Sequence, residues 1–300
     1  MNHYYYHLFG LNIESEIPIL CYSYKKSCRD IKICFGNVPD KIDEAHISKG
    51  VNFKFSIRNE FWLYIKYVAH FFVRNGDEII VEPFDNADLN TITSYLSSVV
   101  IGIALLQRKL LALHGSSVVM NNKCLVFTGV SGAGKSTMCN LLSNKGFKFL
   151  SDDISVLYTD KVGIPLVQPS YPYQRLCKDA ATHIHDRTDV QYSEEEDGKL
   201  LCYMPNSFID KPAPLTAIIE LSPKQDCIIN IKELAGTDKL KSFLDNIFCF
   251  AFLKQAGVDQ KIFIDAYKII KNTPYYRLEW PIGLYAPNQL TDLVMEIIRD

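Results

Sequence analysis

The residues best suited to chemistry in this sequence lie in a glycine-rich stretch, residues 129–137, which reads GVSGAGKST. The stretch fits the pattern G-x-x-x-x-G-K-[S/T], in which the backbone amides of a loop surround phosphate groups. Its glycines let the backbone approach phosphate oxygens with no Cβ in the way, and the dipole of a following helix favours anions. Lys135 supplies a positive charge for the outer phosphates, and the hydroxyl of Ser136 is the expected magnesium ligand.

This pattern predicts a site for a nucleoside triphosphate and magnesium, with an apolar strand before the loop and an amphipathic helix after it. The predicted contacts to the nucleotide all come from the loop and the first turn of that helix: Gly129, Ser131, Gly132, Ala133, Gly134, Lys135, Ser136 and Thr137.

An acidic pair, Asp152 and Asp153, follows a short apolar strand predicted over residues 147–150. Consecutive parallel strands of a β-helix-β unit end at the same edge of a sheet, so both carboxylates are expected beside the terminal phosphate. One carboxylate can hold magnesium, and the other can take a proton from an incoming hydroxyl. A turn in which the pair only caps the next segment is the structural alternative.

Three further groups of polar residues are candidates. His114 stands at the end of an apolar strand predicted over residues 110–113; a lone histidine of this kind is often only a satisfied polar residue. His183, His185 and Asp186 form a second group without a third ligand of clear spacing, so a loop facing solvent or substrate is the better interpretation than a metal site. The acidic run at residues 194–197 is typical of a solvated mobile loop.

The elements around these residues indicate an α/β protein with two domains. Residues 1–86 are rich in β-forming residues and predict a small antiparallel meander, with Asn75-Gly76 as a hairpin turn. Residues 87–300 are predicted to form the catalytic domain, with 87–109 as a linking helix. Prolines interrupt the helix and strand periodicity over residues 161–215. We expect this region to form the groove that binds the acceptor of the phosphoryl group.

The remaining elements are predicted from periodicity and turn residues. Strands are expected at 30–35, 51–57, 61–67, 71–73, 78–82, 117–120, 124–128, 154–158, 217–221, 227–234 and 275–280. Helices are expected at 88–108, 135–144, 237–254, 259–271 and 288–299.

The composition limits the kinds of partner and the cellular compartment that we expect for this protein. The net charge of −2 over 300 residues provides no general attraction for nucleic acid or an anionic membrane. The nine cysteines are scattered without a C-x-x-C pair, which argues against a zinc knuckle and favours a reducing compartment. The start of the chain does not resemble a signal peptide, and no unbroken apolar run reaches the roughly 18 residues of a membrane span. A cytoplasmic protein without a membrane or nucleic-acid partner is expected.

The order of these motifs resembles the HPr kinase/phosphorylase catalytic domain. The resemblance rests on residues 113–118 (LHGSSV), 127–137 and 149–153 (FLSDD), and the same order is similar to ATP-dependent phosphoenolpyruvate carboxykinases. Residues 5–18 (YYHLFGLNIESEIP) and 169–172 (PSYP), with Arg175 and Asp179-Ala180, look like kinases encoded with lasso-peptide pathways.

The resemblance implies roles that the residues alone leave open. It implies that His114 belongs to the active site, that Asp153 is the general base and that Asp152 lies nearer the magnesium, although these two roles could be exchanged. It implies Arg175 as a cation for phosphate or substrate, ATP and Mg²⁺ as cofactors, and the C-terminal serine of a precursor peptide as the acceptor. Related enzymes form homo-oligomers, so a homo-oligomer is a possible partner.

One departure separates this sequence from the bifunctional members of that family. Residues 188–245 contain no P-G-R-N-like signature, which argues against phosphorolysis and against HPr itself as the acceptor. The main hypothesis is an ATP-dependent serine kinase acting on a peptide or small protein. The alternatives are an HPr(Ser) kinase/phosphorylase-type regulator, a nucleotide-gated ATPase or binding module, and, ranked last, a small-molecule kinase or carboxykinase-like enzyme.

Overall fold

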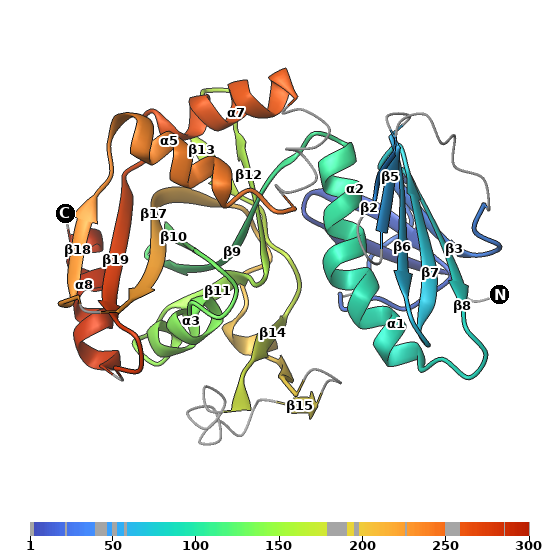
Figure 1. Cartoon of the computed structure of the whole chain (residues 1–300), viewed down its shortest axis with the longest axis horizontal. Coiled ribbons are helices and arrows are strands. Elements are labelled where there is room, and N and C mark those ends of the chain that lie inside the picture. Colours follow the sequence, from blue (N-terminus) through green and yellow to red (C-terminus); the bar gives the residue numbers. More distant parts are fainter. Residues whose placement is uncertain are drawn as a thin grey trace. The chain divides into compact units, whose positions relative to one another are not determined.

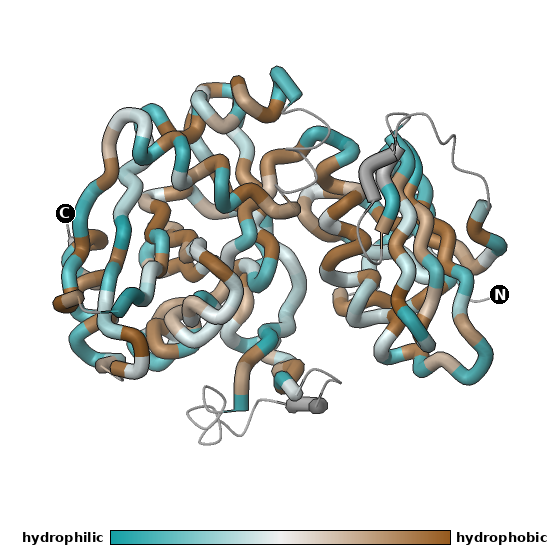
Figure 2. Tube along the Cα trace, in the orientation of Figure 1, coloured by the Kyte–Doolittle hydropathy of each residue, from teal (hydrophilic) through white to brown (hydrophobic). Residues whose placement is uncertain are grey.

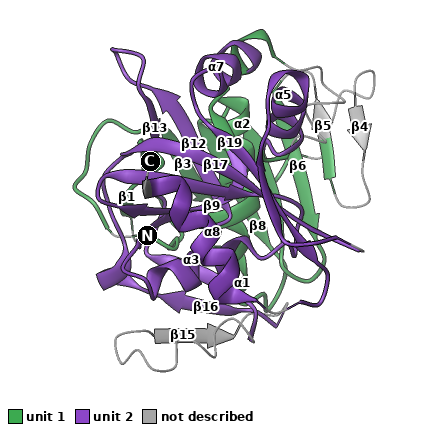
Figure 3. Cartoon of the chain, turned by 90° about the vertical axis from the view of Figure 1, so that its left-hand side faces the viewer, with its two compact units in different colours: residues 1–112, 248–262 green, residues 113–247, 263–300 purple. Residues whose placement is uncertain are grey.

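The computed structural model describes residues 3–21, 23–39, 47–49, 53–56, 59–178, 191–194, 198–225, 227–249, 259–284 and 286–299 (Figure 1). The chain forms two compact units, which Figure 3 distinguishes by colour. Unit 1 comprises Met1–Ala112 and Phe248–Ile262, and unit 2 comprises Leu113–Ile247 and Phe263–Asp300. The protein is therefore a mixed α/β protein with several sheets.

Unit 1 is built on an eight-stranded sheet with the order β1-β2-β3-β8-β7-β6-β5-β4. Its strands are β1 (Tyr4–Leu8), β2 (Leu11–Ser15), β3 (Ile31–Phe35), β4 (Ile47–Lys49), β5 (Phe53–Ser56), β6 (Glu60–Ile65), β7 (Ala69–Arg74) and β8 (Glu78–Pro83). The turn between β7 and β8 is the predicted one, because Asn75 and Gly76 both have positive φ angles, 53° and 68°.

The prediction of a purely antiparallel meander is wrong for part of this sheet. Strands β4 to β8 do form an antiparallel meander, but β3 pairs in parallel with both β2 and β8. Strands β1 and β2 were not predicted at all. Local alternation identifies a strand but not its partner, and the partner here is far away in the sequence.

The predicted helix over residues 88–108 is present as three consecutive segments: α1 (Leu89–Tyr95), the π-helical η2 (Leu96–Val100) and α2 (Ile101–Gln107). Asp88 caps its start by accepting a hydrogen bond from the backbone N–H of Thr91. The helix belongs to unit 1 rather than linking two domains, since Gln107 hydrogen-bonds to Val73 and Gly76 of the β7–β8 hairpin. The first segment of unit 1 therefore ends at Ala112, not at the expected boundary after residue 86.

This helical stretch, Leu89–Gln107, is also the one helix among the described residues that is long and apolar enough to cross a membrane. In Figure 2 much of this stretch is brown, the colour of hydrophobic residues. In this structure 56% of its most apolar window is buried, as in the core helix of a soluble protein, so its composition is weak support for a membrane span. Small residues interrupt this stretch, so it does not form an unbroken apolar run and was not expected to be apolar enough to cross a membrane.

Unit 2 contains a second eight-stranded sheet, with the path β10-β9-β12-β13-β17-β19-β18 and β11 paired to β9. Its strands are β9 (Leu111–Met120), β10 (Lys123–Thr128), β11 (Lys148–Ser151), β12 (Ile154–Thr159), β13 (Pro165–Val167), β17 (Ala213–Lys224), β18 (Asn230–Glu233) and β19 (Tyr275–Pro281). Because β17 also pairs in parallel with β10, the strands from β10 to β17 form a closed path.

Helices lie on both faces of the β10-β17-β19 part of this sheet. On one face, α3 (Lys135–Ser143) and α8 (Pro287–Arg299) bury their apolar sides in a core with Phe127, Ile219 and Leu278. On the other face, α5 (Gly236–Asp245) places Ser242 against Glu220 and Tyr275. Helix α7 (Gln260–Ile270) precedes β19. These helices agree with the predicted ones, although α5 ends at Asp245, before the expected residue 254.

A third, three-stranded sheet occupies the region in which the sequence pattern was expected to break up. Its order is β14-β16-β15, from β14 (Tyr173–Leu176), β15 (Gln191–Glu194) and β16 (Leu200–Tyr203); the short helix η3 (Pro205–Ser207) follows. Leu176, Leu200 and Cys202 face the core of unit 2. These strands are too short to show a clear alternation of apolar and polar residues. The prediction for this region therefore depended on the prolines.

Several predicted features lie outside the described residues. They are Asp179-Ala180, the group His183, His185 and Asp186, and most of the acidic run at residues 194–197.

Candidate active site

The glycine-rich loop joins β10 to α3, as the pattern predicts. Gly134 is the residue before the first helical turn, with φ 91°, and Gly129 and Gly132 also have positive φ angles of 133° and 82°. At Gly129 a Cβ would lie 2.5 Å from the backbone oxygen of Leu221 on β17. The loop can therefore turn away from the sheet only because this position has no side chain.

Lys135 folds back over the loop that precedes it. Its Nζ donates hydrogen bonds to the carbonyl oxygens of Gly129 (3.0 Å) and Val130 (3.1 Å), and the residue is buried. Burial lowers the pKa of Lys135, while the carboxylates of Asp153 and Asp152 oppose that change. Lys135 is thus a cation inside the loop, where the phosphates of a nucleotide would lie.

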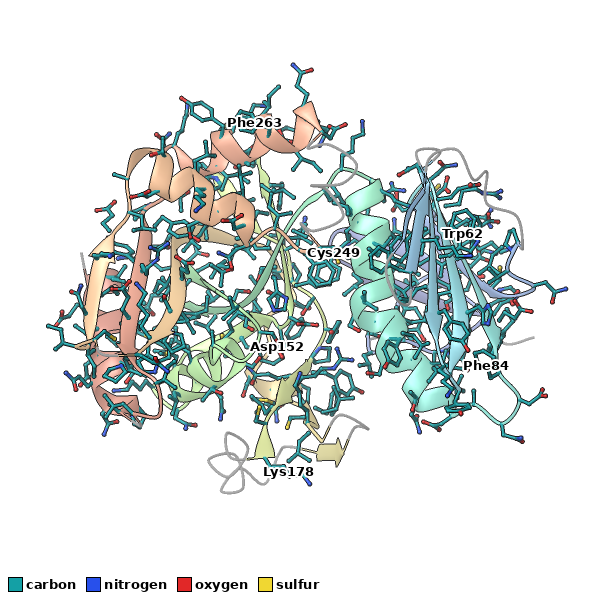
Figure 4. All side chains as sticks on the ribbon, in the orientation of Figure 1. Trp62, Phe84, Asp152, Lys178, Cys249 and Phe263 are labelled. Atoms are coloured by element: carbon teal, nitrogen blue, oxygen red, sulfur yellow. The ribbon has the colours of Figure 1, made fainter. Side chains whose placement is uncertain are left out.

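Asp152, labelled in Figure 4, directly follows β11. It is a buried carboxylate, with 2% of its surface exposed. Its Oδ1 accepts hydrogen bonds from the hydroxyls of Ser116 (2.6 Å) and Ser136 (2.8 Å), and its Oδ2 accepts one from the backbone N–H of Arg175 (2.8 Å). Burial raises the pKa of Asp152, and these hydrogen bonds partly offset the rise. The two residues expected on the magnesium side, Ser136 and Asp152, are in direct contact.

Asp153 is in a different environment from its neighbour. Its φ angle of 66° directs the chain out of the strand, and 32% of its side chain is exposed. Its Oδ1 lies 3.7 Å from Nδ1 of His114, and its Oδ2 lies 3.7 Å from Nη1 of Arg175. Asp153 is therefore the carboxylate of the pair that an incoming group can reach.

His114 lies within β9, not after a strand as the sequence suggested, because β9 continues unbroken from Leu111 to Met120. Its backbone is anchored on both sides: the N–H donates to Asn246 (2.9 Å) and the carbonyl accepts from the hydroxyl of Thr128 (3.0 Å). Burial lowers the pKa of His114, and Lys135 lowers it further, whereas Asp153 opposes these effects. The ring is therefore mostly neutral at pH 7.

Strands β10 and β11, before and after α3, are parallel members of one sheet, as expected, but they are not neighbours in it. Strand β9 lies between them and pairs with both in antiparallel fashion. The two strands run in the same direction and both end beside the middle of β9: Thr128 lies opposite Gly115, and Ser151 lies opposite Ser117. The acidic pair consequently reaches the loop across β9, which contributes His114 and Ser116 to the site.

Arg175 joins the site from β14, and its neighbour Gln174 was not predicted. The Gln174 side chain is buried, and its Nε2 donates to the carbonyl oxygen of Ser136 (3.1 Å). Its Oε1 is buried without a hydrogen-bond partner. The only sequence signals were proximity to other candidates: Gln174 directly precedes Arg175, and Ser116 lies two residues after His114.

A chain of buried hydroxyls supports the strands that carry the acidic pair. The Oγ of Ser151 lies 2.6 Å from that of Ser117 and 2.7 Å from that of Ser155, and Ser155 donates to the carbonyl of Gly115. All three serines are at most 1% exposed. Their hydrogen bonds connect β9, β11 and β12 directly beside Asp152 and Asp153.

The donor set suits a magnesium ion held together with a nucleotide. The described residues contain no group of three or more His, Cys, Asp or Glu side chains that could enclose a metal on their own. Magnesium in nucleotide sites usually has one or two protein oxygens, with phosphate and water oxygens completing its shell. Ser136 and Asp152 provide two such oxygens, and the negative charge of Asp152 would gain a counter-ion there.

Comparisons with known proteins do not assign a family. No family model matches the chain, and no curated protein matches it. Among solved structures, the chain is similar to the HPr(Ser) kinase/phosphatase from Coxiella burnetii, with 11% sequence identity and a TM-score of 0.32. The similarity covers 63% of this chain and 93% of that chain, and it is too remote to carry an argument about function.

Proposed function

We propose that the chain is an ATP- and magnesium-dependent kinase of the HPr-kinase-like type that phosphorylates a serine hydroxyl. The observation that carries the proposal is that the two neighbouring aspartates lie in different environments. Asp152 is buried and bonded to Ser136 of the phosphate loop, while Asp153 is partly exposed beside His114 and Arg175. A kinase needs one carboxylate on the metal side and one that accepts the proton of the acceptor.

In this mechanism the amides of the loop and Lys135 hold the phosphates of ATP, and Arg175 offsets negative charge that develops on the transferred group. The serine oxygen forms a bond to the γ-phosphorus as the bond to the β–γ bridging oxygen breaks, and Asp153 takes the serine proton. Neutral His114 orients Asp153. Magnesium, held by Ser136 and Asp152, would supply charge neutralisation of the phosphates.

We further propose that the acceptor is the C-terminal serine of a lasso precursor peptide, bound in the cytoplasm. This part of the proposal rests on the sequence resemblance of residues 5–18 and of residues 169–172 with Arg175 and Asp179-Ala180. The three-stranded sheet of β14, β16 and β15 is the element that we assign to the acceptor, because β14 contributes Arg175 beside Asp153.

The test is incubation with γ-labelled ATP, magnesium and peptides that end in serine, followed by mass spectrometry of the peptides. Wild-type protein is expected to move the label onto the terminal serine, and a peptide ending in alanine should stay unlabelled. Asp153→Asn is expected to abolish transfer while MgATP still binds. Asp292→Asn is a matched control, because this aspartate lies on α8 with 66% of its side chain exposed.

Each alternative function predicts a different result. Steady ADP release without any phosphorylated product would favour a nucleotide-gated ATPase. Transfer to HPr rather than to a peptide would favour the HPr(Ser) kinase/phosphorylase-type regulator. Normal transfer by Asp153→Asn would show that the general base is another residue.

A further inference from the structure

One buried side chain beside the phosphate loop, that of Gln174, has no role in the function proposed above. Gln174 lies on β14 with 1% of its surface exposed, and it pairs with Cys202 of β16. Cys202 and Leu176, which is two residues further along β14, both belong to the apolar core of unit 2. Because side chains alternate along a strand, the amide of Gln174 points into the same core.

This amide is only partly satisfied in the core. The Nε2 of Gln174 donates a hydrogen bond to the carbonyl oxygen of Ser136 (3.1 Å), but its Oε1 accepts none from the part of the chain that the structure describes. A buried acceptor of this kind has lost its hydrogen bonds to water and destabilises the folded state. An apolar side chain of the same length would fill the position without that cost. The stability of the core therefore does not explain the amide of Gln174.

The hydrogen bond that Gln174 does make ends at the start of α3. Ser136 is the second residue of this helix, so its carbonyl lies in the first helical turn. The bond from Gln174 fixes the backbone of that turn from outside the helix. Since a side chain takes its direction from the backbone that carries it, the same bond helps to fix the Ser136 hydroxyl, which donates to Oδ1 of Asp152 (2.8 Å).

The next residue of β14 holds the other half of this pair. The backbone N–H of Arg175 donates to Oδ2 of Asp152 (2.8 Å). Two consecutive residues of β14 thus hold Ser136 and Asp152, the residues that we assign to the magnesium side of the site. Groups that are hydrogen-bonded to metal ligands orient those ligands, and their loss typically weakens metal binding or activity by roughly 10–100-fold.

We propose that Gln174 is a positioning residue that sets the affinity of the site for magnesium bound together with the nucleotide. It acts through Ser136 and touches neither the metal nor the nucleotide itself. This inference rests on the kinase function proposed above. The amide lowers the stability of the core through Oε1, and through Nε2 it holds the start of α3 in the orientation that the metal side requires.

The experiment measures the dissociation constant of ATP for the full-length chain by isothermal titration calorimetry, once with magnesium and once in EDTA. Gln174→Met replaces the amide by an apolar side chain of the same length. It is expected to weaken ATP binding about 10-fold with magnesium and less than about two-fold in EDTA. The urea midpoint of Gln174→Met should not fall, because the unsatisfied oxygen is removed together with the hydrogen bond.

Leu176→Met is the matched control. Leu176 lies on the same strand and the same buried face as Gln174, so this variant repacks the face while the bond to Ser136 stays in place. It should change neither affinity. A double variant tests the route of the effect: Gln174→Met should add little to Ser136→Ala if it acts through the Ser136 hydroxyl, whereas independent effects would add.

Four outcomes would overturn the inference. Equal weakening of ATP with magnesium and in EDTA would mean that Gln174 shapes the phosphate loop as a whole. Additive effects of Gln174→Met and Ser136→Ala would mean that it does not act through Ser136. Magnesium-dependent ATP binding that Gln174→Met leaves unchanged would refute the positioning role and leave the kinase function intact. If wild-type protein bound no ATP, the kinase function itself would fall, and this inference with it.

Discussion

Replacing Gly129 by alanine is expected to destabilise unit 2 and to abolish nucleotide binding. The new Cβ would lie 2.5 Å from the backbone oxygen of Leu221, whereas real Cβ contacts essentially never fall below 3.0 Å. The loop or β17 must therefore move by roughly half an ångström, and neither backbone can rotate away as a side chain can. The loop amides would then point away from their phosphate positions.

The size of the effect follows from two contributions. A non-glycine residue at φ 133° costs about 1–3 kcal/mol in backbone strain, and overpacking against a fixed backbone costs about 1–3 kcal/mol more, together roughly 2–6 kcal/mol. Gly132→Ala is the matched control, because φ is 82° and no atom lies within 4 Å of its Cβ position. Only backbone strain of about 1–2 kcal/mol applies there.

The assay is urea unfolding followed by tryptophan fluorescence. The chain has two tryptophans, Trp62 in unit 1 and Trp280 in unit 2, so a Trp62→Phe background leaves one reporter that packs against the core beside the loop. Gly129→Ala should lower the free energy of unfolding by clearly more than Gly132→Ala. Equal losses would refute the close approach to Leu221, and so would normal MgATP binding by Gly129→Ala.

Three further perturbations test other parts of the site. Ser136→Ala should weaken ATP binding in the presence of magnesium but hardly change it in EDTA, because the hydroxyl contributes to the metal side. Ser151→Ala should cost about 1–3 kcal/mol in unfolding experiments, since it leaves buried hydroxyls unsatisfied; a loss within error would contradict the buried chain. The lowered pKa of folded His114 means that the unfolded state binds more protons below about pH 6.5, so stability falls as pH decreases there. His114→Gln should flatten this decline, measured from urea midpoints between pH 5 and about 7.

Local features of this fold follow from the sequence, and long-range ones do not. The helix over residues 88–108, the hairpin at Asn75-Gly76 and the strand-loop-helix around Gly129 were predicted because neighbouring residues determine them. The parallel pairings of β3 and the insertion of β9 between β10 and β11 were not, because strand partners depend on contacts across many residues.

The sequence by itself determined the phosphate loop. Its features depend only on chain order and backbone sterics. They are the glycines where φ is positive, the lysine and serine at the start of the helix, and the acidic pair after the next strand. Only the tertiary structure decided how the carboxylates differ. Asp152 is buried because Ser116 from β9 and the Arg175 amide from β14 satisfy it, and Asp153 stays accessible because its backbone turns out of the strand. Burial and partners come from segments that only the fold brings together.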